Sequence, residues 1–279
     1  MELVRSKPHV EVDGEGSAEL PSDRSNLVYH SAVHLFQEVD SSFQDLFVSC
    51  HNKIPVKRGL GSSASAIVGG LVAANDLVGN PLTEYDILLM AVELEGHPDN
   101  VTAALFGGAR IVVPGKQGII TSAVTIPQDL NVVLYIPENA ISTVEARSVL
   151  PDKVSYEDAV FNMGRVALLV NALSGDRVQD LSVGTEDRLH QPYRQNLFPA
   201  MRLIIREALK AGALGAFVSG SGSTVLAFAR GREMSIAYEM AEAARKANAP
   251  GRTIITSPSD KGAYVVKNPR EGFVARVHG

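Results

Sequence analysis

Apolar residues recur at helical spacing in many segments of the chain, which predicts a protein rich in amphipathic helices. In residues 24–39, Leu27, Leu35 and Phe36 lie near one face of such a helix. Thr83 followed by Asp86 has the spacing of a helix-capping box, with Asp in place of the usual Glu. The predicted helices cover residues 24–39, 63–76, 83–96, 98–106, 142–151, 156–175, 198–212 and 232–248.

Shorter apolar runs between these helices are typical of β-strands. The run NVVLYIP is continuously apolar, as expected of a strand buried on both faces. The predicted strands cover residues 43–56, 109–113, 131–137, 215–220, 224–230, 252–258 and 263–268. Because strands and helices alternate, we expect mixed α/β layers. Residues 115–128 are polar and rich in turn formers, which places a domain boundary there and predicts domains 1–125 and 126–279.

Composition narrows the class of protein. The net charge of −5 and the absence of a basic block argue against nucleic acid as a main partner. No apolar run is long enough to span a bilayer, and the first residues lack the apolar core of a signal peptide, so no membrane association is expected. The single cysteine, Cys50, excludes an intramolecular disulfide and fits a reducing cytoplasm. No Cys/His cluster indicates zinc.

Residues 59–66, GLGSSASA, are the most informative stretch. A glycine-rich turn opens there onto a helix-compatible run, so backbone N–H groups and the helix dipole favour an anion. Ser62 and Ser63 add hydroxyls for phosphate or Mg²⁺. The stretch matches neither GxxxxGK[ST] nor GxGxxG, so a bound nucleotide would indicate another kinase class. A serine-capped helix after a flexible turn is the competing interpretation.

Two further segments narrow the choice: residues 94–112, LEGHPDNVTAALFGGARIV, and residues 214–228, LGAFVSGSGSTVLAF. Together with GLGSSASA, and in this order, they resemble the motifs of the GHMP kinases. EGHPDN before a GG-containing strand is similar to the homoserine kinase branch of that family. The resemblance extends from about Val10 to the C-terminus. It implies an α+β two-domain fold, with an ATP-binding N-terminal domain like ribosomal protein S5 domain 2 and a ferredoxin-like C-terminal domain.

The resemblance also implies a set of nucleotide contacts, with ATP as cofactor together with Mg²⁺. Ser63 and Glu93 match the metal site, with Glu95 as the competing carboxylate. The glycine turn around Gly220 and Gly222 would face the phosphate loop, although Ser223 stands where proline is usual. The implied cofactor-binding residues are Lys57, Arg58, Gly59, Leu60, Gly61, Ser62, Ser63, Ala64, Gly220 and Gly222.

The substrate side is implied in the same way. From chemistry alone, His97 and Asp99 fit helix-capping groups. The resemblance instead places them, with Asn100, around the hydroxyl and amino group of L-homoserine. Asp99 and Asn100 are then the catalytic candidates, and whether Asp99 is a general base stays open. The implied contacts to the rest of the substrate, chiefly its carboxylate, are Thr143, Arg147 and Arg194.

The predicted activity is ATP-dependent phosphorylation of L-homoserine in threonine biosynthesis, by an enzyme that is compatible with a homodimer. One feature of the sequence argues against this predicted activity. The family's first motif, a Pro-x-Ser-x-Asn-Leu-Gly-Pro-Gly-Phe-Asp-like stretch, has no counterpart ahead of Val10. The first strand and two substrate contacts would be missing with it, so poor activity is expected. The alternatives are another small-molecule kinase of the mevalonate-pathway type, or a truncated nucleotide-binding remnant without turnover.

Overall fold

The computed structural model describes residues 9–41, 46–268 and 272–276, and these form two compact units. Unit 1 contains the described parts of 1–56, 61–123 and 259–279, and unit 2 contains 57–60 and 124–258. The predicted boundary after residue 125 lies two residues beyond the division after residue 123, and two further segments differ. Residues 57–60 fall in unit 2, and the described residues after 258 fall in unit 1.

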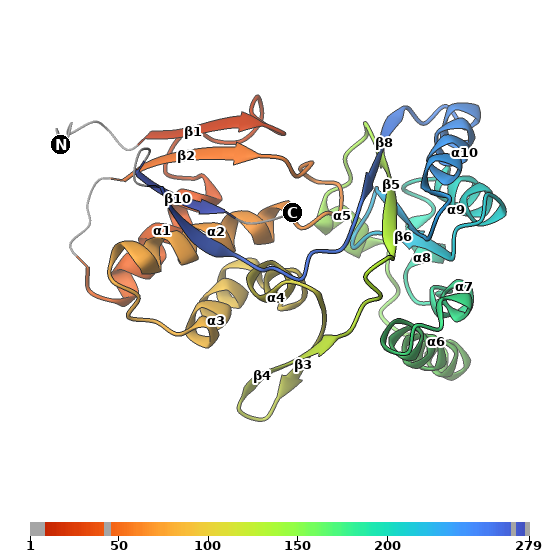
Figure 1. Ribbon diagram of the computed structural model, residues 1–279, viewed down its shortest axis with the longest axis horizontal. Coiled ribbons are helices and arrows are strands. Elements are labelled where there is room, and N and C mark those ends of the chain that lie inside the picture. The colour runs from red at the N-terminus through yellow and green to blue at the C-terminus, as the bar shows by residue number, and fades with distance from the viewer. Residues whose placement is uncertain (1–8, 42–45, 269–271, 277–279) are drawn as a thin grey trace. The chain divides into compact units, whose positions relative to one another are not determined.

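Unit 1 combines four helices with three pairs of strands in its described residues (Figure 1). Strands β1 and β2 run parallel, in a register that places Gly14 opposite Asn52. The helices are α1 (Leu27–Glu38), α2 (Ser62–Leu77), α3 (Glu84–Glu95) and α4 (Asp99–Phe106). The strand pairs are β1 (His9–Gly14) with β2 (Phe47–Asn52), β3 (Ala109–Gly115) with β4 (Gly118–Val124), and β9 (Tyr264–Asn268) with β10 (Gly272–Arg276).

The core of unit 1 lies around helix α2. Its residues Ile67 and Leu71 are buried together with Leu35 of α1 and Leu88 of α3. Gly70 lets α1 and α2 approach closely, since a Cβ there would lie 2.5 Å from the carbonyl oxygen of Val28. The glycine loop is therefore joined to a helix that is fixed on several sides.

Unit 2 is built on a four-stranded antiparallel sheet in the order β6-β7-β5-β8. Its central strand β5 is buried on both faces, as the continuous apolar run predicted: Val133 and Tyr135 belong to one apolar cluster, and Val132 and Leu134 to another. The strands are β5 (Asn131–Pro137), β6 (Gly215–Val218), β7 (Val225–Ala229) and β8 (Gly251–Thr256). The helices are α5 (Thr143–Ser148), α6 (Tyr156–Ser174), α7 (Leu181–Gly184), α8 (Gln191–Arg194), α9 (Met201–Lys210) and α10 (Glu233–Lys246), with a 3₁₀ turn at Val178–Asp180.

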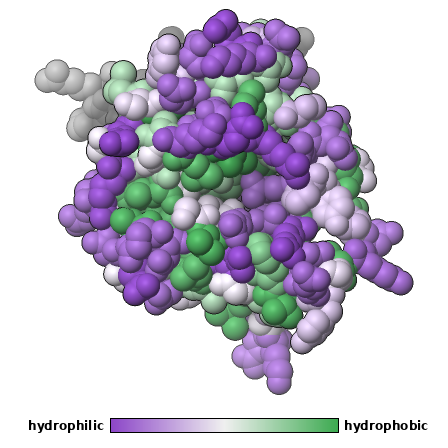
Figure 2. Space-filling model, turned by 90° about the vertical axis from the view of Figure 1, so that its right-hand side faces the viewer, coloured by the Kyte–Doolittle hydropathy of each residue, from purple (hydrophilic) through white to green (hydrophobic). Residues whose placement is uncertain are grey.

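The face shown in Figure 2 is mainly hydrophilic, with hydrophobic patches between the polar residues. Helix α6 leaves apolar side chains exposed: Met163 is 63% and Val166 is 57% exposed. Within the described ranges, none of the helices has both the length and the apolar character needed to cross a bilayer.

All eight predicted helices are present, and the capping box of Thr83 and Asp86 is confirmed. Six elements of the described residues were not predicted: the strands β1, β4 and β10, the short helices α7 and α8, and the 3₁₀ turn Val178–Asp180. Strand β4 lies within the turn-rich range 115–128 and pairs with β3, and the division between the two units after residue 123 falls inside the same range. The strand predicted over 43–56 is confined to Phe47–Asn52, and residues 42–45 lie outside the described part of the chain.

Candidate active site

The start of helix α2, in unit 1, is built for an anion. Gly61 is the N-cap residue, with φ of 73° in the left-handed region, and no side chain caps the helix. The interpretation as a serine-capped helix is therefore wrong. Because the first N–H groups of a helix have no intrahelical partner and carry the positive end of its dipole, this end favours a phosphate.

A carboxylate lies beside the first turn of α2. The Ser63 hydroxyl donates a hydrogen bond of 2.7 Å to Oε1 of Glu95. The Glu95 side chain is only 9% exposed, whereas Glu93 is 72% exposed and lies 3.9 Å from Nε2 of His34. Two residues apart on a helix point to nearly opposite sides, so α3 presents Glu95 and not Glu93 to Ser63. This geometry favours Glu95, the competing carboxylate, over Glu93 as the partner of Ser63.

The GHPDN segment, also in unit 1, places further polar side chains next to Glu95. Nε2 of His97 lies 4.0 Å from Oε1 of Glu95, and Nδ1 of His97 lies 2.7 Å from Oδ1 of Asp99. The same Asp99 oxygen accepts a 2.7 Å hydrogen bond from the Asn100 backbone N–H. A Cβ on Gly61 would lie 3.9 Å from Oδ1 of Asn100, so this amide faces the glycine loop. The residues predicted from GLGSSA and EGHPDN are thus brought together.

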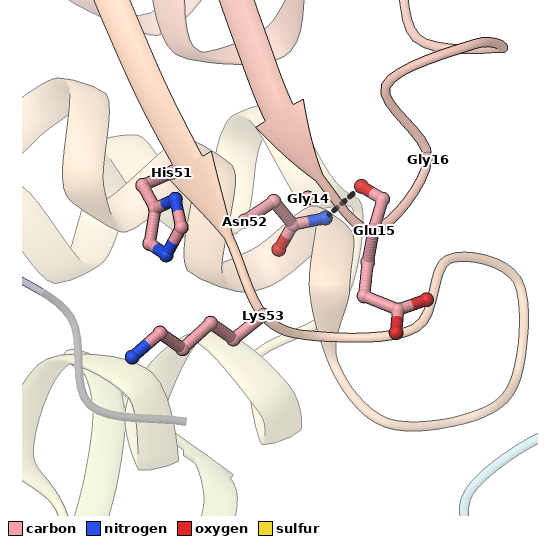
Figure 3. Close-up of a pocket in the computed structure, with 6 residues that line it drawn as sticks. All are labelled: Gly14, Glu15, Gly16, His51, Asn52 and Lys53. Carbon is pink, nitrogen blue, oxygen red and sulfur yellow. Dashed lines mark hydrogen bonds between the residues drawn. The ribbon is translucent and has the colours of Figure 1, made fainter.

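An open pocket of about 420 Å³ lies where strands β1 and β2 end, and sequence reasoning did not single it out. Figure 3 shows that it is polar, with the Asn52 amide donating a 2.8 Å hydrogen bond to the Glu15 carbonyl oxygen. In the sequence, this pocket corresponds to the GEG segment at residues 14–16 and the polar HNK segment at residues 51–53. None of the predicted site residues lines it; the lining residues are Gly14, Glu15, Gly16, His51, Asn52 and Lys53.

The first half of the glycine loop, Lys57–Leu60, packs against the second glycine turn inside unit 2. The Ser219 hydroxyl donates to the Gly59 carbonyl oxygen at 2.8 Å, and the Thr224 N–H donates to the Arg58 carbonyl oxygen at 3.3 Å. A Cβ on Gly59 would overlap the Ser219 carbonyl oxygen and lie 2.8 Å from the Gly222 nitrogen. The approach of the two turns therefore requires glycine at position 59.

Arg58 fixes this loop segment to the end of strand β5. Its Nε donates to the Pro137 carbonyl oxygen at 2.8 Å, and its Nη2 donates to the Glu138 carbonyl oxygen. These two donors therefore serve the backbone and are not free for a phosphate. Ser223, which is 1% exposed, is satisfied by a 2.8 Å hydrogen bond to the Asn139 carbonyl oxygen, so serine is accommodated at this position.

The two predicted carboxylate-binding arginines are close enough to interact in unit 2. Burial lowers the pKa of Arg194, and the charge of Arg147 lowers it further, against the opposing effect of Asp187. Nε of Arg194 donates to the Ala146 carbonyl oxygen at 3.2 Å, and Nη1 donates to the Gly220 carbonyl oxygen at 2.7 Å. Arg147 is exposed on α5, whose first residue is the exposed Thr143.

Sequence reasoning missed Asp187, which organises the segment before α8. Its side chain is 8% exposed and accepts hydrogen bonds from the backbone of His190 at 2.9 Å and Gln191 at 2.6 Å. It also accepts one of 2.7 Å from the Asn162 amide. Burial raises the pKa of Asp187, but these hydrogen bonds and His190 outweigh it and leave the pKa lowered. An Asp shortly before Gln-Pro is a helix-start signal that could have been noticed.

Among the described residues, no cluster of three or more His, Cys, Asp or Glu side chains is arranged for a metal ion. The Ser63–Glu95 pair is a different kind of candidate. Mg²⁺ in nucleotide sites is typically held by one or two protein oxygens, with phosphates and water completing its shell. A hydroxyl and a nearly buried carboxylate 2.7 Å apart fit that donor set.

Both units match family models of one class of kinase. Residues 26–108 match the GHMP kinases N terminal domain, and residues 169–248 match the GHMP kinases C terminal model. The chain therefore belongs to the GHMP kinase family.

Within that family, several curated homoserine kinases are similar to this chain. That of Caldanaerobacter subterraneus subsp. tengcongensis is 38% identical over 96% of this chain and 86% of its own length. That of Carboxydothermus hydrogenoformans is 41% identical over 93% and 84%. The crystal structure of homoserine kinase from Cytophaga hutchinsonii matches with a TM-score of 0.81 at 28% identity, covering 92% of this chain and 84% of that one. The mevalonate kinase of L. major, at 18% identity and a TM-score of 0.66 over 91% and 82%, shares the fold.

Proposed function

We propose that this protein transfers the γ-phosphoryl group of ATP to the hydroxyl of L-homoserine, giving ADP and O-phospho-L-homoserine for threonine biosynthesis. The observation that carries the proposal is the set of curated homoserine kinases about 40% identical over nearly the whole chain. The uncapped start of α2 beside the Ser63–Glu95 pair supports it, because phosphoryl transfer depends on holding and neutralising phosphate charge.

The nucleotide half of the proposal assigns the backbone of 59–63 to the ATP phosphates. Ser63 and Glu95 are expected to hold Mg²⁺, which would offset the negative charge of the phosphates when bound. Arg58 and Ser219 act indirectly, since their hydrogen bonds fix the backbone of Lys57–Leu60. Preorganised N–H groups that need no rearrangement during the reaction are the main source of stabilisation in such sites.

The substrate half assigns Arg147 and Arg194 to the carboxylate of homoserine, with Thr143 nearby. Guanidinium groups suit this role because they bind carboxylates with two parallel hydrogen bonds. His97, Asp99 and Asn100 are assigned to the amino group and hydroxyl. Oδ1 of Asp99 is already engaged by His97 and the Asn100 N–H, which supports an orienting role for Asp99 rather than proton abstraction.

The test is an ADP-release assay with purified protein, ATP and Mg²⁺, in which L-homoserine and mevalonate are compared as acceptors. Phosphorylation of homoserine with a much higher kcat/KM than mevalonate is expected, since mevalonate lacks the amino group. A preference for mevalonate would overturn the substrate assignment. ATP binding by calorimetry without turnover of either acceptor would instead support the nucleotide-binding remnant.

A further inference from the structure

Three of the five N–H groups of Arg194 donate hydrogen bonds to atoms of unit 2. Nε donates to Ala146, and Nη1 divides its two hydrogens between the Gly220 carbonyl oxygen at 2.7 Å and Nδ1 of His190 at 3.2 Å. Within the described part of the chain, Nη2 has no protein partner. The guanidinium is therefore fixed by its other two nitrogens, and Nη2 is the group that remains for a ligand.

The contact between His190 and Arg194 requires one form of the imidazole ring. A guanidinium only donates, so His190 accepts a hydrogen bond only when Nδ1 carries no proton. The proton of neutral His190 is then on Nε2, which lies 3.8 Å from Oδ2 of Asp187. Asp187 thus faces the protonated nitrogen and favours the tautomer that accepts from Arg194.

We infer that His190 is a positioning residue: held by Asp187, it fixes the orientation of Arg194 in which this guanidinium binds the carboxylate of the amino-acid substrate. This inference rests on the proposed function. It assigns a role to the His-Gln-Pro-Tyr-Arg segment beyond the arginine itself. One turn of α8 brings both side chains together, because residues four apart lie on the same helix face.

Burial is the main reason that His190 is uncharged. It lowers the pKa of the ring below the usual 6.5 and outweighs Asp187, which raises this pKa, while the smaller effect of Arg194 lowers it further. Arg147 on α5 is near enough for its positive charge to lower the pKa of Arg194, so it adds to the positive charge of this group of side chains. The ring is therefore neutral at pH 7 and above. Protonation in acid would remove the acceptor and place a second positive charge against Arg194.

The decisive experiment compares His190→Ala and His190→Asn in the ADP-release assay. The Asn carbonyl oxygen takes the place of Nδ1 and can accept from Arg194, but it does not titrate. At pH 7.5, His190→Ala should raise the KM for homoserine about three- to tenfold with the KM for ATP unchanged, the loss expected for one hydrogen bond. His190→Asn should restore the KM to within about twofold of the unmodified protein. His30→Asn, at an exposed position of α1, is the matched control.

The pH profile and a double-mutant cycle complete the test. The KM for homoserine should rise as the pH falls below 6.5 in the unmodified protein and stay flat in His190→Asn. In an Arg194→Ala background, His190→Ala should have no further effect on KM. An unchanged KM in His190→Ala, an Asn variant as poor as Ala, or an acid limb that persists in the Asn variant would each overturn the inference. Failure of the unmodified protein to phosphorylate homoserine would instead remove the proposed function itself.

Discussion

The two units hold their candidate site groups in different ways. In unit 1 the polar side chains bind one another: Ser63 donates to Glu95, and His97 lies against Asp99. In unit 2 the cationic side chains bind backbone carbonyl groups, as Arg58 does with Pro137 and Glu138.

The two arrangements suit different roles: binding a metal ion in unit 1 and fixing the direction of a guanidinium group in unit 2. Glu95 contacts a hydroxyl and an imidazole and keeps oxygen lone pairs for a metal ion, which suits neutralisation of phosphate charge. An arginine bound to main-chain oxygens is fixed in direction because its planar fork needs matching acceptors. Unit 1 should therefore respond most to changes in charge, and unit 2 to changes in side-chain shape.

The largest effect is expected when charge is removed from unit 1. Glu95→Gln should lower kcat about 100- to 1000-fold, the usual cost of losing one group that stabilises the transferring charge. Glu93→Gln, on the same helix but 72% exposed, should remain near the unmodified rate. The measurement is kcat at saturating Mg²⁺ and ATP. Equal losses in both variants would contradict the assignment of the metal ligand to Glu95.

In unit 2, Arg147→Ala should raise the KM for homoserine about ten- to a hundredfold and leave the KM for ATP nearly unchanged. The reason is the loss of a charge-assisted hydrogen bond, which costs about 1.5–3 kcal/mol. Steady-state kinetics against each substrate separate the two KM values. Arg206→Ala, at an exposed arginine of α9, serves as control, and a parallel rise in the KM for ATP would argue against a carboxylate contact.

Substitution of Gly59, in unit 2, and of Gly61, in unit 1, should change the free energy of unfolding by different amounts. Gly59→Ala should destabilise the protein by at least about 2 kcal/mol, because the new Cβ combines a positive φ with overlap on Ser219. Gly61→Ala meets only an atom at 3.9 Å, so backbone strain of about 1–2 kcal/mol is its main cost. Urea unfolding measures both. ATP calorimetry should show weaker binding for folded Gly61→Ala, because its Cβ would lie at the proposed position of the phosphates.

The smallest expected effect is that of Asp187 on the free energy of unfolding at acid pH. The pKa of Asp187 in the folded protein is below 3.8, so its stabilising contribution is present above that value and is lost as the pH falls through the folded-state pKa. Asp187→Asn should flatten this part of the curve of unfolding free energy against pH. The change should stay below about 1.5 kcal/mol, the scale of one hydrogen bond. An unaltered acid limb would show that other carboxyl groups determine it.

Much of the architecture followed from local pattern alone. Helical periodicity located eight of the ten α-helices in the described residues. Thr83 and Asp86 fixed the start of one, and the apolar run at 131–137 identified the central strand of unit 2. These features depend on residues near one another in the chain, so the sequence is sufficient to predict them. The ordered motifs also indicated the family, which the matches to both domain models confirm.

Only the tertiary structure decided which of these residues meet. Glu93 and Glu95 are the same residue type two positions apart, so the sequence alone does not distinguish them. The packing of α3 against α2 places Glu95 beside Ser63. Arg58 lies in the phosphate-loop sequence, yet its partners are carbonyl groups about eighty residues away. His190 becomes relevant only because α8 places it against Arg194, whose other contacts come from α5 and the second glycine turn. Long-range packing sets such pairings, and no local spacing encodes them.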